Sequence, residues 1–106
     1  MNDAPYPIVT VHRLTLPVRN ADDIVERLRQ FLPEAAAELE GLDAVSLFRA
    51  VAYPDIAIVA HWRDQAARGA AAARMSTHPT LVAILREANA GDMETYQEIE
   101  TITPGA

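Results

Sequence analysis

The sequence predicts an α+β domain in which a four-stranded antiparallel sheet carries helices on one face. Three observations favour this fold class. First, the 106 residues are close to the usual size of one domain, and half of them are hydrophobic. Second, segments with strand and helix patterns follow the order strand, helix, strand, strand, helix, strand, which is the ferredoxin-like βαββαβ order. Third, no linker or internal repeat interrupts the chain, so residues 1–106 are assigned to a single domain.

The first strand is predicted at residues 8–16, where β-branched side chains are frequent. Alternation along this strand places His12 on the same face as Leu14 and Leu16. That face is mostly apolar, so His12 is expected to turn toward the interior. A buried histidine is often only a hydrogen-bonded core residue, and this interpretation stays open beside a functional one.

The first helix is predicted to begin after Asn20, whose side chain suits an N-cap, and to end before Gly41. Apolar residues between these two positions recur at helical spacing. Pro33 lies within the run, and it is expected either to kink the helix or to begin a second short one.

Two further strands, at residues 43–51 and 56–62, are joined by the turn "AYPD" and are expected to form an antiparallel hairpin. The second of them is apolar on both faces, because Ile58 alternates with Ala57 and Val59. Helices cover only one face of the sheet in this fold, so the other face needs a partner. We therefore expect a homodimer joined through its sheets.

The remaining elements follow the chain's only tryptophan, Trp62. Asp64 is expected to cap an alanine-rich helix, and Pro79 suits the first position of another helix, entered from His78. The final strand is predicted at residues 93–102. It carries three glutamates, as an exposed edge strand does.

Composition argues against several classes of function. A net charge of −6 is unsuited to binding a phosphate backbone, and the absence of lysine excludes Schiff-base chemistry. The three histidines lack the spacing of a metal site, and no nucleotide-binding glycine motif is present, so neither a metal nor a cofactor is expected. No apolar stretch approaches the length of a membrane span, and residues 1–10 lack the features of a signal peptide, which favours a cytoplasmic protein.

Five segments together resemble the antibiotic biosynthesis monooxygenase (ABM) family: "HRLTL", "ADDIVERL", "GLDAVSLFRAV", "VAHWRD" and "HPTLVAILREA". The resemblance extends from about Val9 to Ala88, and its most specific feature is Trp62 with the acidic residue and helix that follow. It implies a dimeric α+β barrel. Function is transferred less safely than fold, because one fold can host many chemistries.

The cofactor-free anthrone oxygenases of this family use a strand tryptophan, a strand asparagine and an arginine late in the last helix. The resemblance therefore implies that Trp62 donates its indole N–H to a substrate oxygen, and that Arg86 stabilises negative charge. Ile58 stands in place of the asparagine, so one polar contact is missing. His12 is the third candidate catalytic residue, as a general base or hydrogen-bond partner. Trp62 as a core aromatic and Arg86 as a solvated helix-end residue remain the structural alternatives.

Heme-degrading monooxygenases form another branch of the family, with an asparagine on the first strand and a heme-ligating histidine in the last helix. His12 falls at that asparagine position, but the ligand position falls at or near Leu85, which cannot bind iron. His78 lies about two helical turns earlier. Heme degradation is therefore disfavoured.

The resemblance implies oxidation of an electron-rich aromatic, of the anthrone or quinol type, by molecular oxygen without a cofactor. The alternative is a non-catalytic dimeric module that binds a small molecule. No nucleic acid or membrane partner is expected for either.

Overall fold

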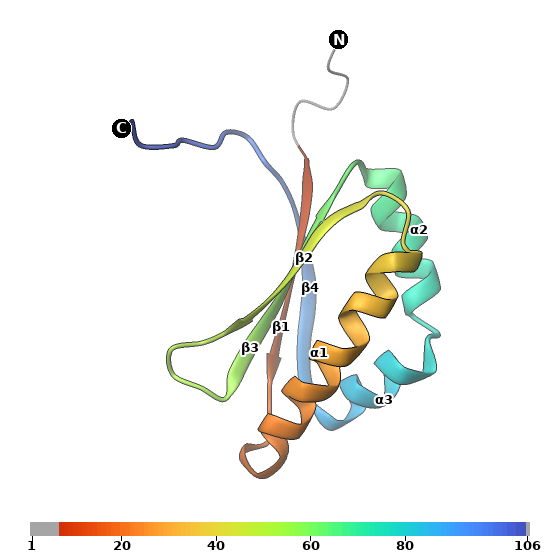
Figure 1. The fold of residues 1–106 in the computed structure, drawn as a ribbon, viewed down its shortest axis with the longest axis vertical. Coiled ribbons are helices and arrows are strands. Elements are labelled where there is room, and N and C mark those ends of the chain that lie inside the picture. The colour runs from red at the N-terminus through yellow and green to blue at the C-terminus, as the bar shows by residue number, and fades with distance from the viewer. Residues whose placement is uncertain (1–6, 106) are drawn as a thin grey trace.

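The sheet and the helices form two layers in the computed structural model, which describes residues 7–105 (Figure 1). Residues 1–6, on which the signal-peptide argument partly depended, lie outside the described part. The elements are β1 (Ile8–Thr15), a 3-10 turn η1 (Val18–Asn20), α1 (Ala21–Glu38), β2 (Leu42–Arg49), β3 (Asp55–Trp62), α2 (Gln65–Met75), α3 (Pro79–Glu87) and β4 (Asn89–Gln97). The strand order is β2-β3-β1-β4, and each neighbouring pair is antiparallel. The predicted ferredoxin-like α+β fold is confirmed.

Helix α1 runs without interruption through Pro33, so the second helix considered at this position does not form. Pro33 is exposed, while Leu28, Phe31 and Ala35 on the opposite side are buried. Packing of this apolar stripe holds the helix on both sides of the proline. Asn20 occupies the predicted N-cap position, but its side chain makes no capping hydrogen bond.

The two later helices start where predicted, with Asp64 as the cap of α2 and Pro79 as the first residue of α3, and the structure adds a side-chain cap from His78. The Asp64 carboxylate accepts a hydrogen bond of 2.8 Å from the backbone N–H of Ala67. At α3, Pro79 is the first helical residue, and Nδ1 of His78 accepts from the N–H of Thr80 at 3.2 Å. Both contacts satisfy N–H groups that the helix itself leaves unpaired.

Strand β4 lies at an edge of the sheet, as predicted, but it begins at Asn89 rather than at residue 93 and ends at Gln97. The stretch "NAGD" has turn-like composition and no apolar alternation. Its pairing with β1 therefore comes from the tertiary structure rather than from local preference. The register shifts by one residue between His12 and Leu14 of β1, which marks a β-bulge in β4.

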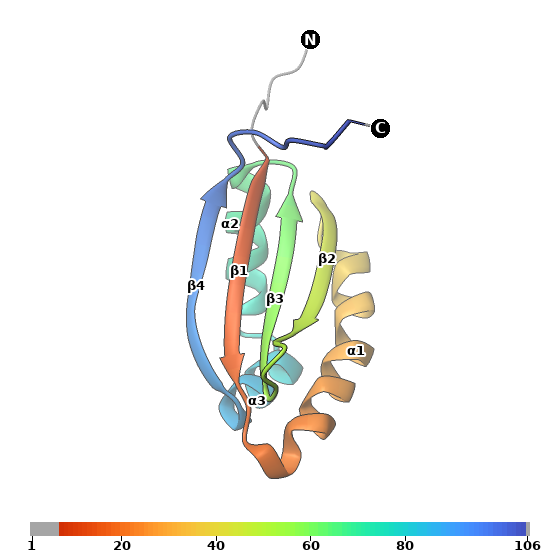
Figure 2. The same cartoon turned by 90° about the vertical axis from the view of Figure 1, so that its left-hand side faces the viewer.

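All three helices cover one face of the sheet, and the opposite face is bare (Figures 1 and 2). The core between the layers contains the largest of the fully buried side chains, Leu14, Ile24, Leu28 and Ile84. On the bare face the strand registers align half-buried Val11 and Val59, and the exposed side chains of Phe48 and Tyr96 flank them. Among the described residues, no helix is long and apolar enough to span a bilayer.

Candidate active site

A pocket with a volume of about 120 Å³ lies between the helix-covered face of the sheet and the helices. Its walls are largely aliphatic and aromatic side chains from the sheet, including Ile58, and from α1, including Phe31 and Ala35. Four polar or charged side chains also line it: Thr10, His12, Trp62 and Arg68. The structure therefore brings two of the three predicted site residues, His12 and Trp62, into one apolar pocket.

Trp62 is buried at the end of β3, and its indole N–H donates a hydrogen bond of 3.0 Å to Oγ1 of Thr10. Thr10 is itself only 3% exposed. The two residues lie diagonally across neighbouring strands, because Trp62 pairs with Ile8 in the β1–β3 register. The indole proton that the resemblance assigned to a substrate is thus already donated to this threonine.

His12 is held from the side of β4. Its Nε2 lies 2.9 Å from the carbonyl oxygen of Gly91. Because a carbonyl can only accept, Nε2 carries the hydrogen in this contact, and in the neutral imidazole Nδ1 then has the free lone pair. Gly91 belongs to the bulged part of β4, where the extra residue interrupts the regular ladder. The sequence did not predict this bulge, and the contact between His12 and Gly91 was therefore not expected.

Arg86 does not line the pocket, so the structure does not bring it together with His12 and Trp62 there. Its side chain is exposed in the last turn of α3. The core-facing residue of that turn is Ile84, which is 1% exposed. Two helical residues correspond to a rotation of about 200°, so Arg86 points away from the side that Ile84 buries.

The cation in the pocket is Arg68 of α2, which sequence analysis did not single out. Its Nε donates to Gln65 at 2.9 Å. Arg68, Ala71, Ala72 and Met75 all line the pocket and follow the i, i+3, i+4, i+7 pattern of one helix face. This spacing could have identified Arg68 as a pocket residue from the sequence. The alanines of the stripe leave space over Trp62.

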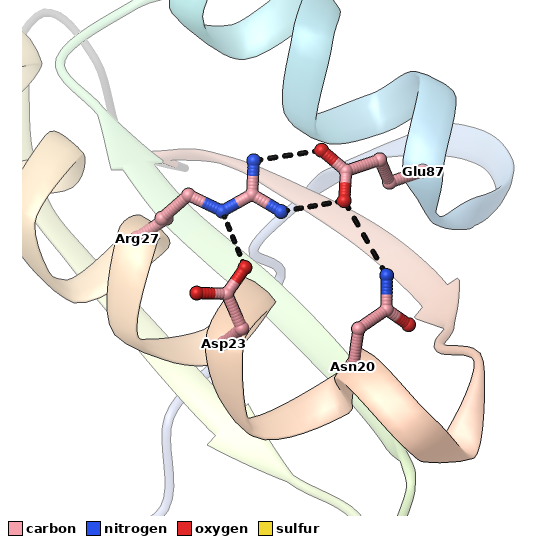
Figure 3. Close-up of polar contacts among 4 residues, drawn as sticks. All are labelled: Asn20, Asp23, Arg27 and Glu87. Atoms are coloured by element: carbon pink, nitrogen blue, oxygen red, sulfur yellow. Dashed lines mark hydrogen bonds and ion pairs between the residues drawn. The ribbon is translucent and has the colours of Figure 1, made fainter.

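The neighbour of Arg86, Glu87, belongs to a separate polar cluster that joins α3 to the start of α1 (Figure 3). Arg27 donates two hydrogen bonds to its carboxylate, at 2.8 and 2.7 Å, and Nε of Arg27 lies 3.0 Å from Asp23. Asn20 donates to the same carboxylate at 3.3 Å. These hydrogen bonds from Arg27 lower the pKa of Glu87, whereas bonding to Glu87 raises the pKa of Arg27. The cluster lies outside the pocket lining and anchors the last helix.

The two residues considered in connection with heme, Leu85 and His78, take part in packing contacts in the structure. Leu85 packs against the main core, and the His78 ring contacts Phe31 edge-on at 4.9 Å between centroids. Within residues 7–105, no group of three or more potential metal-ligating side chains is present. His61 alternates with Trp62 along β3 and therefore belongs to the bare face.

Searches with protein-family models and among curated proteins find no match to this chain. Solved structures do match. The cofactor-independent oxygenase SnoaB from Streptomyces nogalater superposes with a TM-score of 0.72 at 17% identity, covering 93% of this chain and 99% of its own. A Deinococcus radiodurans protein, provisionally described as an antibiotic biosynthesis monooxygenase, gives 0.65 at 14% identity and covers 93% and 97%. A dimeric ferredoxin-like protein from an uncultured marine organism gives 0.74 at 12% identity and covers 92% and 99%.

At these identities the likeness concerns the fold and not the chemistry. It extends over nearly the whole of each matched structure, so no large part of those folds lacks a counterpart here. The chain therefore has the ferredoxin-like α+β fold of these solved structures, one of which is provisionally described as an antibiotic biosynthesis monooxygenase, in agreement with the resemblance found in its sequence.

Proposed function

We propose that the protein is a cofactor-independent monooxygenase that oxidises an electron-rich phenolic compound, of the anthrone or quinol type, with molecular oxygen. The observation that carries the proposal is the setting of His12. Its Nε2 is bound to the Gly91 carbonyl, which leaves Nδ1 as the proton acceptor, and the ring lines an apolar pocket shared with Trp62. A base in an apolar pocket is what the chemistry requires, because a phenol reacts readily with oxygen only after it loses its proton.

In this mechanism His12 takes the proton of the substrate hydroxyl. The Arg68 guanidinium, the only cation that lines the pocket within the described residues, stabilises the anion. The anion passes one electron to oxygen, and the substrate radical and superoxide combine into a carbon-bound peroxide. Loss of water from the peroxide leaves a quinone. One oxygen atom thus enters the substrate, and the other leaves in water with two substrate hydrogens.

The assembly in this proposal is a homodimer joined through the bare sheet faces. Half-buried valines at the centre of that face, and exposed Phe48 and Tyr96 beside them, give it the apolar character of an interface. The marine protein of the same fold is described as dimeric, which favours the same arrangement.

Oxygen consumption tests the proposal. Wild-type protein should accelerate oxygen uptake by hydroquinones, naphthohydroquinones or anthrones above their spontaneous rate. His12→Ala should remove this acceleration while retaining the fold. If the wild type binds these compounds but never exceeds the background rate, the alternative of a non-catalytic binding module replaces the oxygenase. If His12→Ala is as fast as wild type, His12 is not the base.

A further inference from the structure

We infer that the pocket accepts a single phenolic ring, and that the Thr10 hydroxyl donates the hydrogen bond that recognises the phenolic oxygen. The inference rests on the proposed function and narrows its substrate class to one-ring phenols and quinols, which leaves out the fused-ring naphthohydroquinones and anthrones. It assigns ligand recognition to a residue to which neither the sequence nor the resemblance gave a role.

The hydrogen-bond inventory of the Trp62–Thr10 pair leads to this assignment. The Trp62 indole has a single donor, and that donor is used on Thr10 Oγ1 at 3.0 Å. A threonine hydroxyl can accept and also donate. Among residues 7–105, no acceptor receives the Thr10 hydroxyl hydrogen, although Thr10 is buried. An unused buried donor is costly unless something else satisfies it.

The pocket is where that donor can be satisfied, because Thr10 is one of its lining residues. An oxygen placed there would complete a chain from the indole N–H through the threonine hydroxyl to the ligand. Accepting a hydrogen bond polarises a hydroxyl and makes it a better donor, so Trp62 strengthens the contact that Thr10 makes. Trp62 is on this view a positioning residue for Thr10, and its ring forms part of the apolar wall.

The size of the pocket restricts the ligand. Its volume is about 120 Å³, whereas an engineered apolar cavity of about 150 Å³ holds one benzene ring. The pocket is thus of single-ring size, and a fused two- or three-ring system would extend beyond this volume unless the sheet and the helices separated. Protein interiors resist such separation because they are closely packed.

The spacing of Thr10 and His12 is compatible with one small ligand that reaches both. They are two residues apart on the same face of β1, which corresponds to about 6.6 Å along the strand. A phenolic oxygen placed between these two side chains can accept a hydrogen bond from Thr10 and lose its proton to His12. The cross-strand partner of His12 is Ile58, which keeps the intervening wall apolar.

Anaerobic titration calorimetry with phenol, toluene and 1-naphthol tests the inference, since it measures recognition without turnover. Wild type should bind phenol about tenfold more tightly than toluene, the difference that one buried hydrogen bond makes. It should bind 1-naphthol more weakly than phenol. Thr10→Val should remove the preference for phenol over toluene, and Thr10→Ser, which keeps the hydroxyl, should retain it.

Thr10→Val leaves the Trp62 N–H without its acceptor, so a second pair of variants avoids that defect. Trp62→Phe should keep the preference for phenol, and Trp62→Phe/Thr10→Val should lose it. Equal affinity for phenol and toluene in wild type, a preference that survives Thr10→Val, or tighter binding of 1-naphthol than of phenol would overturn the inference. Phenol binding without oxygen uptake from any compound would contradict the proposed oxygenase alone.

Discussion

The imidazole of His12 and the backbone carbonyl of Gly91, 79 residues apart in the sequence, are joined by a hydrogen bond of 2.9 Å. The bulge in β4 makes this contact possible, since it removes the carbonyl from the regular ladder between β1 and β4. The bond fixes which ring nitrogen carries the proton. The edge strand thereby orients the candidate base without contributing a side chain.

Nitrogen NMR of the histidine side chains should find that the neutral imidazole of His12 carries its hydrogen on Nε2. The Gly91→Ala variant should keep this tautomer, because an added Cβ would meet only the Arg13 carbonyl oxygen at 3.4 Å, an ordinary contact. Deleting Gly91 removes the bulge, and the tautomers of His12 should then mix. His78 serves as the internal control, because its Nδ1 accepts a hydrogen bond from the N–H of Thr80 and not from β4. A deletion variant with an unchanged His12 spectrum would contradict the role of the bulge.

Arg68→Gln should weaken the binding of an anionic phenol, such as 4-nitrophenolate, by about tenfold, since a hydrogen bond to a charged group contributes roughly 1.5–3 kcal/mol. Arg74→Gln is the matched control in the same helix. Arg74 is exposed, pairs with Glu38 at 3.2 Å and does not line the pocket. Its loss should change the free energy of unfolding by about 0.5 kcal/mol or less and leave binding unchanged. Equal binding losses in the two variants would mean that only the overall charge matters.

The comparison of Arg86 with Arg68 also shows what could and could not be predicted from the sequence. The motif "LREA" puts Arg86 in the last turn of the last helix, as in the similar family. The direction of its side chain depends on how the helix is rotated against the sheet, and here Ile84 faces inward while Arg86 is exposed. On α2 the i, i+3, i+4, i+7 spacing places Arg68 on the helix face that lines the pocket. Helical spacing was therefore the better guide to the pocket cation than similarity at one position.

The order of elements, the Asp64 cap and the start of α3 at Pro79 were predictable, because they depend on local composition. The bond between Trp62 and Thr10 was not, since alternation assigns a residue to a face but not to a cross-strand neighbour. The start of β4 was missed for a related reason. Its N-terminal residues are held by pairing with β1 and have no strand pattern of their own.

Acid should weaken the junction between α1 and α3. Arg27 lowers the pKa of Glu87 in the folded protein, so the stability that this carboxylate contributes is present above its unfolded pKa, near 4.5. That stability is lost as pH falls through the lower folded value. Thermal unfolding measured from about pH 6 down to about pH 3 should therefore show a smaller loss for Glu87→Gln than for wild type.

Glu34→Gln is the control for this acid dependence. Glu34 is exposed on α1 and makes no ion pair within the described residues. Its variant should follow the wild-type curve throughout. If Glu87→Gln also follows that curve, the cluster in Figure 3 contributes nothing measurable to stability.

The bare face of the sheet should be the dimer interface, and a charge placed at its centre should separate the subunits. Val59 lies on the middle strand pair, opposite Val11, and is half-buried within the single chain. Light scattering should give a mass of about twice 11.6 kDa for wild type and about 11.6 kDa for Val59→Arg. Burying an unpaired guanidinium at an interface costs several kcal/mol, which is enough to dissociate a dimer at micromolar concentration.

Val18→Arg is the control, since it introduces the same charge at a residue that is 82% exposed and outside the sheet, and this variant should remain dimeric. A monomeric wild type, or a Val59→Arg variant that stays dimeric, would place any association elsewhere. The bare valines would then need another partner to cover them.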